Sequence, residues 1–172
     1  MKERNINGDL FFSIVLPVYN AEKYIGSSIF SIINQSFKNF AIIIINDYSN
    51  NESLNIIQKL QFQFNTIKII NHSSNLGIYI SREEGILNSN GIYIIFIDSD
   101  DLFLNPFLFQ KLYEFNSEYN LDIIEFIVLY QEEGKNNLFF PIDHKLNHFH
   151  NFTEKIIYQP ELSNILFYVP GT

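Results

Sequence analysis

Short runs of aliphatic residues alternate along the chain with stretches in which apolar residues recur every three or four positions. The runs are of strand length and lie at residues 13–18, 40–45, 66–70 and 92–97. In the first, second and fourth runs, positions that would point to either side are mostly apolar, so each predicts a strand buried on both faces. The run 66–70, which contains Lys68, predicts a third strand. Pro17 is expected to end the first strand, before a turn.

The stretches between these runs show helical spacing. They predict helices over residues 21–35, 53–64 and 75–88, with Ile25 and Ile29 on one face of the first helix. Strands that alternate with helices favour an α/β fold. In such a fold a mostly parallel sheet is sandwiched by helices, and the crossovers are right-handed.

The pattern is weaker after residue 101. The expected elements there are a helix over 106–119, strands over 122–130 and 138–142, a His-rich loop over 143–151 and a final helix over 153–167. No repeat, low-complexity linker or clean boundary divides the chain. We therefore expect a single domain over residues 1–172.

Polar residues follow three of the predicted strands. Tyr19 and Asn20 come after the first strand, Asp47 after the second, and the segment 98–101 after the fourth. Ligands of open α/β sheets bind at the carboxyl ends of the strands. The three loops are thus expected to converge on one crevice.

The segment 98–101 reads Asp98, Ser99, Asp100 and Asp101. Its carboxylates repel one another unless they are solvated or bound to a cation. Hard oxygen ligands suit Mg²⁺ or Mn²⁺, which complete their shells with water and substrate phosphates. Such a cation would stabilise a diphosphate leaving group. A solvated acidic loop that caps the next helix is the alternative interpretation.

Asp47 and Arg82 each have two interpretations. Asp47 either forms an Asx-turn or accepts a hydrogen bond from a nucleobase or ribose. Arg82 either pairs with a neighbouring Glu on the helix surface or clamps a phosphate or base edge. Ser81 and Gly85 are small and four residues apart, so this helix can approach the sheet closely.

Three histidines, His144, His148 and His150, lie close together in the sequence. They could contribute to a metal site, although isolated surface histidines are the commoner case. No glycine-rich phosphate loop of dinucleotide or Walker spacing is present.

Composition and charge limit the classes of partner. The chain has 172 residues, a formal net charge of -8 and no cysteine. The negative field disfavours nucleic acid as a partner, and the lack of cysteine excludes disulfides and thiolate catalysis. Without a signal-peptide pattern or a membrane-length apolar run, a cytoplasmic protein is expected. Peripheral attachment to the inner face of the membrane stays open, as does the oligomeric state.

Five motifs in order resemble family 2 of the glycosyltransferases, which are inverting enzymes of the GT-A (Rossmann-like) fold. The resemblance covers residues 12–105, the half expected to bind the nucleotide sugar, and leaves 106–172 as a partial acceptor half. The matching motifs are 13–20 (Ser-Ile-Val-Leu-Pro-Val-Tyr-Asn), 35–37 (Gln-Ser-Phe), 44–49 (Ile-Ile-Asn-Asp-Tyr-Ser), 75–85 (Asn-Leu-Gly and Ser-Arg with Gly85) and 91–101 (Gly-Ile-Tyr-Ile and Asp-Ser-Asp-Asp).

The resemblance implies transfer of a sugar from a nucleoside diphosphate donor, expected to be UDP-linked, to a hydroxyl of a glycan or lipid-linked glycan in polysaccharide or lipopolysaccharide synthesis. It implies Mn²⁺ or Mg²⁺ as cofactor. Tyr19 would pack against the base, and Asp98 would lie on the ribose side. The implied nucleotide-sugar-binding residues are Pro17, Tyr19, Asp47, Arg82, Asp98 and Ser99, and the implied metal ligands are Asp100 and Asp101.

The chain departs from the family pattern at three positions. Asn46 stands for the first of two acids, Tyr48 stands for a glycine and would narrow the pocket, and Glu83 stands for an Asn and could pair with Arg82. A catalytic base is not identifiable, and Asp122, Glu125 and Asp143 are candidates by charge only. A non-catalytic nucleotide-binding or assembly module, derived from such an enzyme, is the alternative function, and the chain could be a truncated domain. A sugar nucleotidyltransferase is disfavoured, since its glycine-rich loop is lacking.

Overall fold

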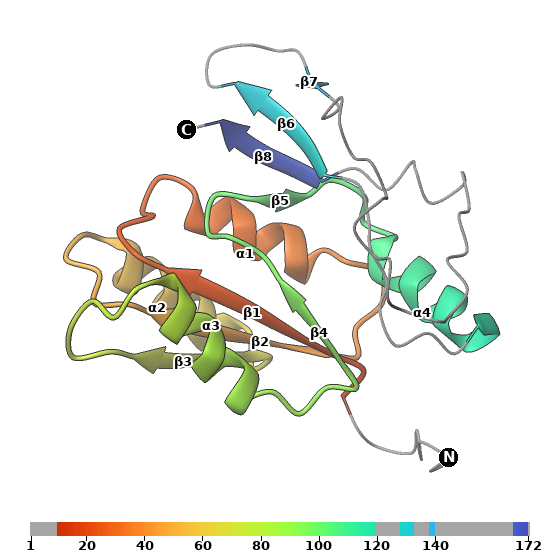
Figure 1. Ribbon diagram of the computed structural model, residues 1–172, viewed down its shortest axis with the longest axis horizontal. Coiled ribbons are helices and arrows are strands. Elements are labelled where there is room, and N and C mark those ends of the chain that lie inside the picture. Colours follow the sequence, from red (N-terminus) through yellow and green to blue (C-terminus); the bar gives the residue numbers. More distant parts are fainter. Residues whose placement is uncertain (1–9, 120–127, 133–137, 140–166, 172) are drawn as a thin grey trace, which may run out of the picture.

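The computed structural model describes residues 10–119, 128–132, 138–139 and 167–171 (Figure 1). These residues form strands and helices in the alternating order that the sequence predicts. The elements are β1 (Phe12–Val18), α1 (Ile25–Ile33), β2 (Phe40–Asn46), α2 (Ser53–Gln63), β3 (Ile67–Asn71), α3 (Ile78–Leu87), β4 (Tyr93–Phe96), β5 (Leu102–Phe103), α4 (Leu108–Tyr119), β6 (Val128–Glu132), β7 (Leu138–Phe139) and β8 (Phe167–Gly171).

The first four strands form a parallel sheet in the order β3-β2-β1-β4. β1 is central, and all seven of its residues are buried. The carboxyl ends of β1 and β2 are level, because Val18 pairs with Asn46. This sheet confirms the α/β fold class and brings the predicted loops to one edge.

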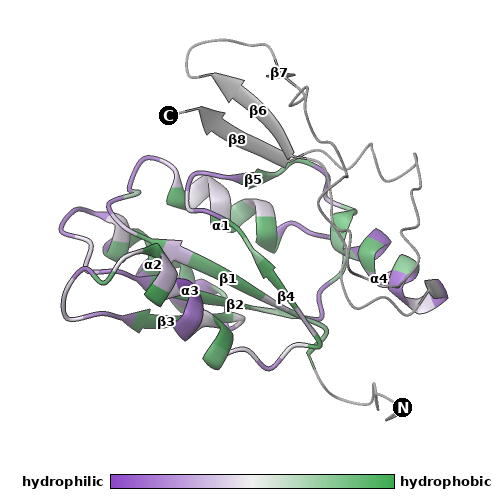
Figure 2. Ribbon diagram, viewed as in Figure 1, coloured by the Kyte–Doolittle hydropathy of each residue, from purple (hydrophilic) through white to green (hydrophobic). Residues whose placement is uncertain are grey.

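Helices cover both faces of the central strands β1 and β2, as their apolar runs predict. The prediction is wrong for the edge strand β4, in which Ile94 and Phe96 are exposed. Alternate residues of β1 and β2, such as Ile14 and Ile42, share a buried cluster with α1 and α2. Val15 points to the opposite face, where it meets Gly85 of α3. Figure 2 shows that the central strands are apolar.

Pro17 does not end the first strand, contrary to the expectation. It lies inside β1, is buried and pairs with Ile45. Odd-numbered residues of β1 direct their backbone groups toward β4, as the bond from Ile97 N to Val15 O shows. β4 ends opposite Val15, so the missing N–H of Pro17 removes no bond from the ladder.

α1 and α3 begin later than predicted, whereas α2 begins at Ser53 as expected. α1 starts at Ile25 instead of residue 21, because residues 22–24 form a turn. α3 starts at Ile78 after Gly77, whose φ of 86° only glycine adopts readily. The helices themselves are confirmed.

The C-terminal expectations are met in part. Helix 106–119 is confirmed as α4, while strands 122–130 and 138–142 correspond in their described parts to β6 and β7. β5, β8, β6 and β7 form a second sheet. The His-rich loop 143–151 and nearly all of the predicted helix 153–167 lie outside the described residues; residue 167 belongs to β8. None of the helices described is long and apolar enough to cross a membrane.

Gly85 fixes how closely α3 approaches the sheet. A Cβ at this position would lie 2.2 Å from Cγ1 of Val15. Gly26 in α1 differs, since a Cβ at this position would lie 3.9 Å from its nearest neighbour, Cγ2 of Ile56. The small residue that the sequence singled out therefore has a packing role.

Gly85→Ala is expected to lower the free energy of unfolding by about 1–3 kcal/mol, because the added methyl overpacks the contact with Val15. The matched substitution Gly26→Ala should be neutral or stabilising by up to about 1 kcal/mol, since alanine favours a helix and the site has room. Urea unfolding of both variants measures the difference. Equal effects would show that α3 does not depend on this close approach.

Candidate functional site

The loops after β1 and β2 are joined by hydrogen bonds. Asn20 N donates to Ser49 Oγ at 3.1 Å, and Asn50 N donates to Asn20 Oδ1 at 2.9 Å. Asn20 and Tyr48 both have positive φ, 51° and 61°. Each turn thus depends on the other for its shape.

Asp47 connects the end of β2 to the start of α3. Its Oδ1 accepts from Leu76 N at 2.7 Å and its Oδ2 from Gly77 N at 2.8 Å. The residue is only 4% exposed. Both carboxylate oxygens of Asp47 are thus already bonded inside the protein. The predicted hydrogen bond from a nucleobase to Asp47 would have to add to these bonds or replace one of them.

His72 lies between two carboxylates, and the sequence analysis missed it. Its Nδ1 is 2.7 Å from Asp47 Oδ1 and its Nε2 is 2.6 Å from Glu84 Oε2. Only 4% of the side chain is exposed. Both ring nitrogens must donate to satisfy both carboxylates, which favours the charged imidazolium. A histidine directly after a strand at the ligand-binding edge was the signal available in the sequence.

This arrangement shifts both pKa values. Desolvation by burial, the largest single effect, lowers the pKa of His72, but hydrogen bonds and charge attraction from Asp47 and Glu84 together raise it above 6.5. Burial likewise raises the pKa of Asp47, while the hydrogen bonds from Leu76, His72 and Gly77 hold it below 3.8. The pair is therefore ionised at intermediate pH.

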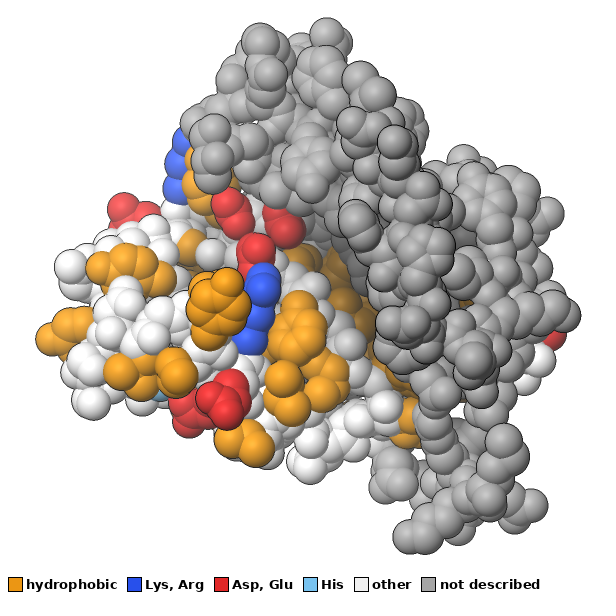
Figure 3. Space-filling model, in the orientation of Figure 1, with side chains coloured by type: hydrophobic (Ala, Val, Ile, Leu, Met, Phe, Trp, Pro, Cys, Tyr) orange, Lys and Arg blue, Asp and Glu red, His pale blue; other side chains and the backbone are white. Residues whose placement is uncertain are grey.

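Arg82 pairs with Asp98 rather than with Glu83, the partner that one of the two interpretations suggested. Its Nη2 donates to Asp98 Oδ1 at 2.7 Å, and its Cζ lies over the ring of Phe96, 5.8 Å from the ring centroid. The two charged side chains are 39% and 47% exposed, and Glu83 is exposed beside them. Figure 3 shows acidic side chains gathered next to a basic one on this face.

Asp101 is the best candidate for a cation ligand. Its Oδ1 is buried and has no hydrogen-bond partner among the described residues. Burial, followed by the charges of Asp100 and Asp98, raises the pKa of Asp101 to about 7. An unsatisfied carboxylate oxygen next to two further carboxylates suits a divalent cation.

The described residues hold no group of three His, Cys, Asp or Glu side chains placed to bind a metal. Mg²⁺ sites in proteins often use one or two carboxylates, with water and substrate phosphates as the other ligands. Asp100 and Asp101 fit that smaller set.

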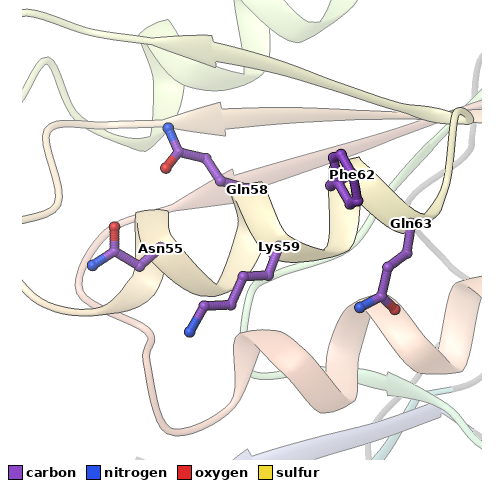
Figure 4. A pocket seen from close by; sticks show the side chains of 5 residues that line it. All are labelled: Asn55, Gln58, Lys59, Phe62 and Gln63. Atoms are coloured by element: carbon purple, nitrogen blue, oxygen red, sulfur yellow. The ribbon is translucent and has the colours of Figure 1, made fainter.

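The remaining predicted residues are placed as follows. Tyr19 is half-exposed after β1, Pro17 is buried, and Ser99 is partly buried in the acidic loop. The depression in Figure 4 lies on the outer face of α2 and includes none of the predicted site residues. The base candidates and the three clustered histidines lie outside the described residues; they are Asp122, Glu125, Asp143, His144, His148 and His150.

The fold and the acidic loop after β4 define a glycosyltransferase domain of the GT-A class. TarS from Staphylococcus aureus, solved in complexes with UDP and with UDP-GlcNAc, matches with a TM-score of 0.64 and 27% identity in each. The match covers 76% of this chain and 38% of the TarS chain in the UDP complex. The chain belongs to glycosyl transferase family 2, whose family model matches residues 13–172.

Curated relatives agree with this membership. A glycosyltransferase of Haemophilus influenzae described as uncharacterized is 38% identical over 100 residues, covering 58% of this chain. The minor teichoic acid biosynthesis protein GgaB of Bacillus subtilis is 30% identical over 175 residues, covering the whole chain. The chain spans 40% of the first relative and 19% of the second.

His72→Gln is expected to lower the free energy of unfolding by about 1–3 kcal/mol near pH 6, because it removes the charge-assisted hydrogen bonds to the buried Asp47 and to Glu84. The folded-state pKa of His72 lies above 6.5, so its stabilising contribution is complete below that pH. The contribution is lost as the pH rises through the folded-state pKa. The difference between wild type and variant should therefore shrink in alkaline buffer. Urea unfolding from about pH 5.5 to about pH 9 measures it, and a constant difference would refute a charged His72.

Asp101→Asn is expected to raise the melting temperature without metal by about 2–8 °C at about pH 8. The folded-state pKa of Asp101 is raised to about 7, so the wild type loses stability as the pH rises from about 4 through that value. Asp101→Asn has no carboxylate at this position to ionise, so it does not lose this stability.

Added Mn²⁺ should raise the melting temperature of the wild type at about pH 8 but not that of Asp101→Asn. Glu83→Gln, which also removes one exposed negative charge, is the control and should behave as wild type in both respects. If Mn²⁺ stabilises Asp101→Asn as strongly as the wild type, Asp101 is not a ligand of the cation.

Proposed function

We propose that the chain is the nucleotide-sugar-binding part of an inverting, metal-assisted glycosyltransferase. The observation that supports this most directly is the acidic loop after β4, where Arg82 is bonded to Asp98 and Asp101 keeps an unsatisfied buried oxygen. A positive guanidinium next to cation-binding carboxylates suits a diphosphate. Because the chain belongs to glycosyl transferase family 2, the proposed reaction is the transfer of a sugar.

The donor in this proposal is a UDP-linked sugar. TarS, 27% identical to this chain, has been solved with both UDP and UDP-GlcNAc bound. In this chain the half-exposed ring of Tyr19 after β1 would contact the base, and Asp98 would contact the ribose. The side chain of Arg82 is 39% exposed, so its guanidinium can donate to a phosphate while it stays over Phe96.

The chemistry required of the chain is mainly positioning and charge stabilisation. A Mn²⁺ or Mg²⁺ ion held by Asp100 and Asp101 would neutralise the diphosphate as it leaves. Arg82 would add a second positive charge on the same leaving group. Inversion also requires a base to deprotonate the acceptor hydroxyl, and its candidates Asp122, Glu125 and Asp143 lie outside the described residues.

The acceptor in this proposal is a hydroxyl of a surface polysaccharide, lipopolysaccharide or teichoic acid. The name of GgaB, which matches across the whole chain, refers to teichoic acid biosynthesis. We propose that the reaction takes place on the cytoplasmic side of the membrane, where nucleotide sugars are available.

A non-catalytic nucleotide-binding module is the second candidate. Asn46 replaces an acid of the family pattern and is itself 3% exposed, with its amide bonded to Asn71 at 3.0 Å. A site altered in this way can bind a nucleotide without turning it over. Release of free sugar from UDP-GlcNAc, lost in Asp100→Ala, would exclude this candidate.

Calorimetry with UDP-GlcNAc, with and without Mn²⁺, tests the proposed binding. The wild type should bind more tightly with Mn²⁺, and both Arg82→Ala and Asp100→Asn should weaken binding at least about tenfold, since each removes a charge-assisted contact. Glu83→Gln next to Arg82 is the control and should bind as wild type. If the folded wild type binds neither UDP nor a UDP-sugar in Mn²⁺, the proposal fails.

A further inference from the structure

We propose that Tyr48 supplies an aromatic wall of the donor site and packs against the nucleobase. The inference rests on the proposed function and extends it, since Tyr48 stands where the family pattern has a glycine. Its basis is the conformation of the residue, the exposure of its ring and the position of its loop.

The backbone of Tyr48 is in a conformation that disfavours its side chain. Its φ is 61°, a region in which bulky residues are rare and glycine or asparagine is preferred. The loop is nevertheless closed around it, because Ser49 N donates to Asn46 Oδ1 at 3.3 Å. A strained aromatic residue held by its surroundings points to a role for the ring.

The ring of Tyr48 is also the part of this loop that remains available to a ligand. Asn46 and Asp47 are buried, and their side chains are bonded within the protein. Tyr48, in contrast, is 55% exposed. The loop after β2 thus offers a ligand an aromatic surface in place of a carboxylate.

The loop lies where the base of the proposed donor would be. Val18 pairs with Asn46, and the loops that carry Tyr19 and Tyr48 are cross-bonded through Asn20. Tyr19 is exposed to a similar extent, 51%. Two half-exposed tyrosines thus emerge from neighbouring loops at one edge of the sheet.

The acidic loop follows β4, on the other side of β1 from β2. β2 and β4 are two strand spacings apart across the sheet, about 10 Å. β4 also stops about 10 Å short of the end of β2 along the strands, because it ends opposite Val15 while β2 ends opposite Val18. A nucleoside diphosphate can bridge such a span, with its base at the tyrosines and its phosphates at Asp100 and Arg82. Stacking requires only the flat face of a base, so the ring adds affinity without reading hydrogen bonds.

Two ring-free variants and one ring-retaining variant test the proposal by calorimetry with UDP in Mn²⁺. Tyr48→Asn and Tyr48→Gly both tolerate the positive φ, so their melting temperatures should equal or exceed that of the wild type. Their UDP dissociation constants should nevertheless rise about tenfold. Tyr48→Phe keeps the ring and should bind UDP within about twofold of the wild type.

Inorganic pyrophosphate with Mn²⁺ separates a contact with the base from a general change of the site. This ligand has no base, so the three variants should bind it as the wild type does. The proposal is overturned if the ring-free variants keep wild-type UDP affinity, if Tyr48→Phe loses as much affinity as Tyr48→Asn, or if pyrophosphate binding falls in parallel. A wild type that binds no UDP would overturn the proposed function as well, whereas the other three results leave it standing.

Discussion

The carboxylate of Asp47 is the contact on which the geometry of the site depends. It accepts hydrogen bonds from the backbone N–H groups of Leu76 and Gly77, just before α3. It also contacts His72, and His72 contacts Glu84, which lies in α3. The end of β2, the loop after β3 and α3 are thereby held as one unit. Because Arg82 lies on α3, this buried network also fixes where the guanidinium meets Asp98.

A second constraint comes from like charges at the end of β4. Asp98, Asp100 and Asp101 stand within four residues in a protein of net charge -8. Among the residues that the structure describes, only Asp98 of these three is paired with an arginine. Burial, followed by the charges of Asp100 and Asp98, raises the pKa of Asp101 to about 7. We propose that this site binds a positively charged ligand, which would offset the repulsion among the carboxylates.

Much of the fold could be predicted from the sequence, because continuous aliphatic runs such as β2 leave few alternatives to a buried parallel strand. The place of the acidic loop at the end of β4 followed from the same pattern. The bonding of Asp47 and His72 could not be predicted, since their partners are up to 30 positions away in sequence and become neighbours only in the folded chain. Pro17 was misjudged because its effect depends on where the adjacent strand stops.

The bonds through Asn20 have a consequence for the exchange of loops in this protein. Since the turns after β1 and β2 share hydrogen bonds, neither can be exchanged for that of a relative without disturbing the other. A successful transplant would have to carry both segments together. The two turns therefore form one structural unit, although more than 25 residues of chain separate Asn20 from Ser49.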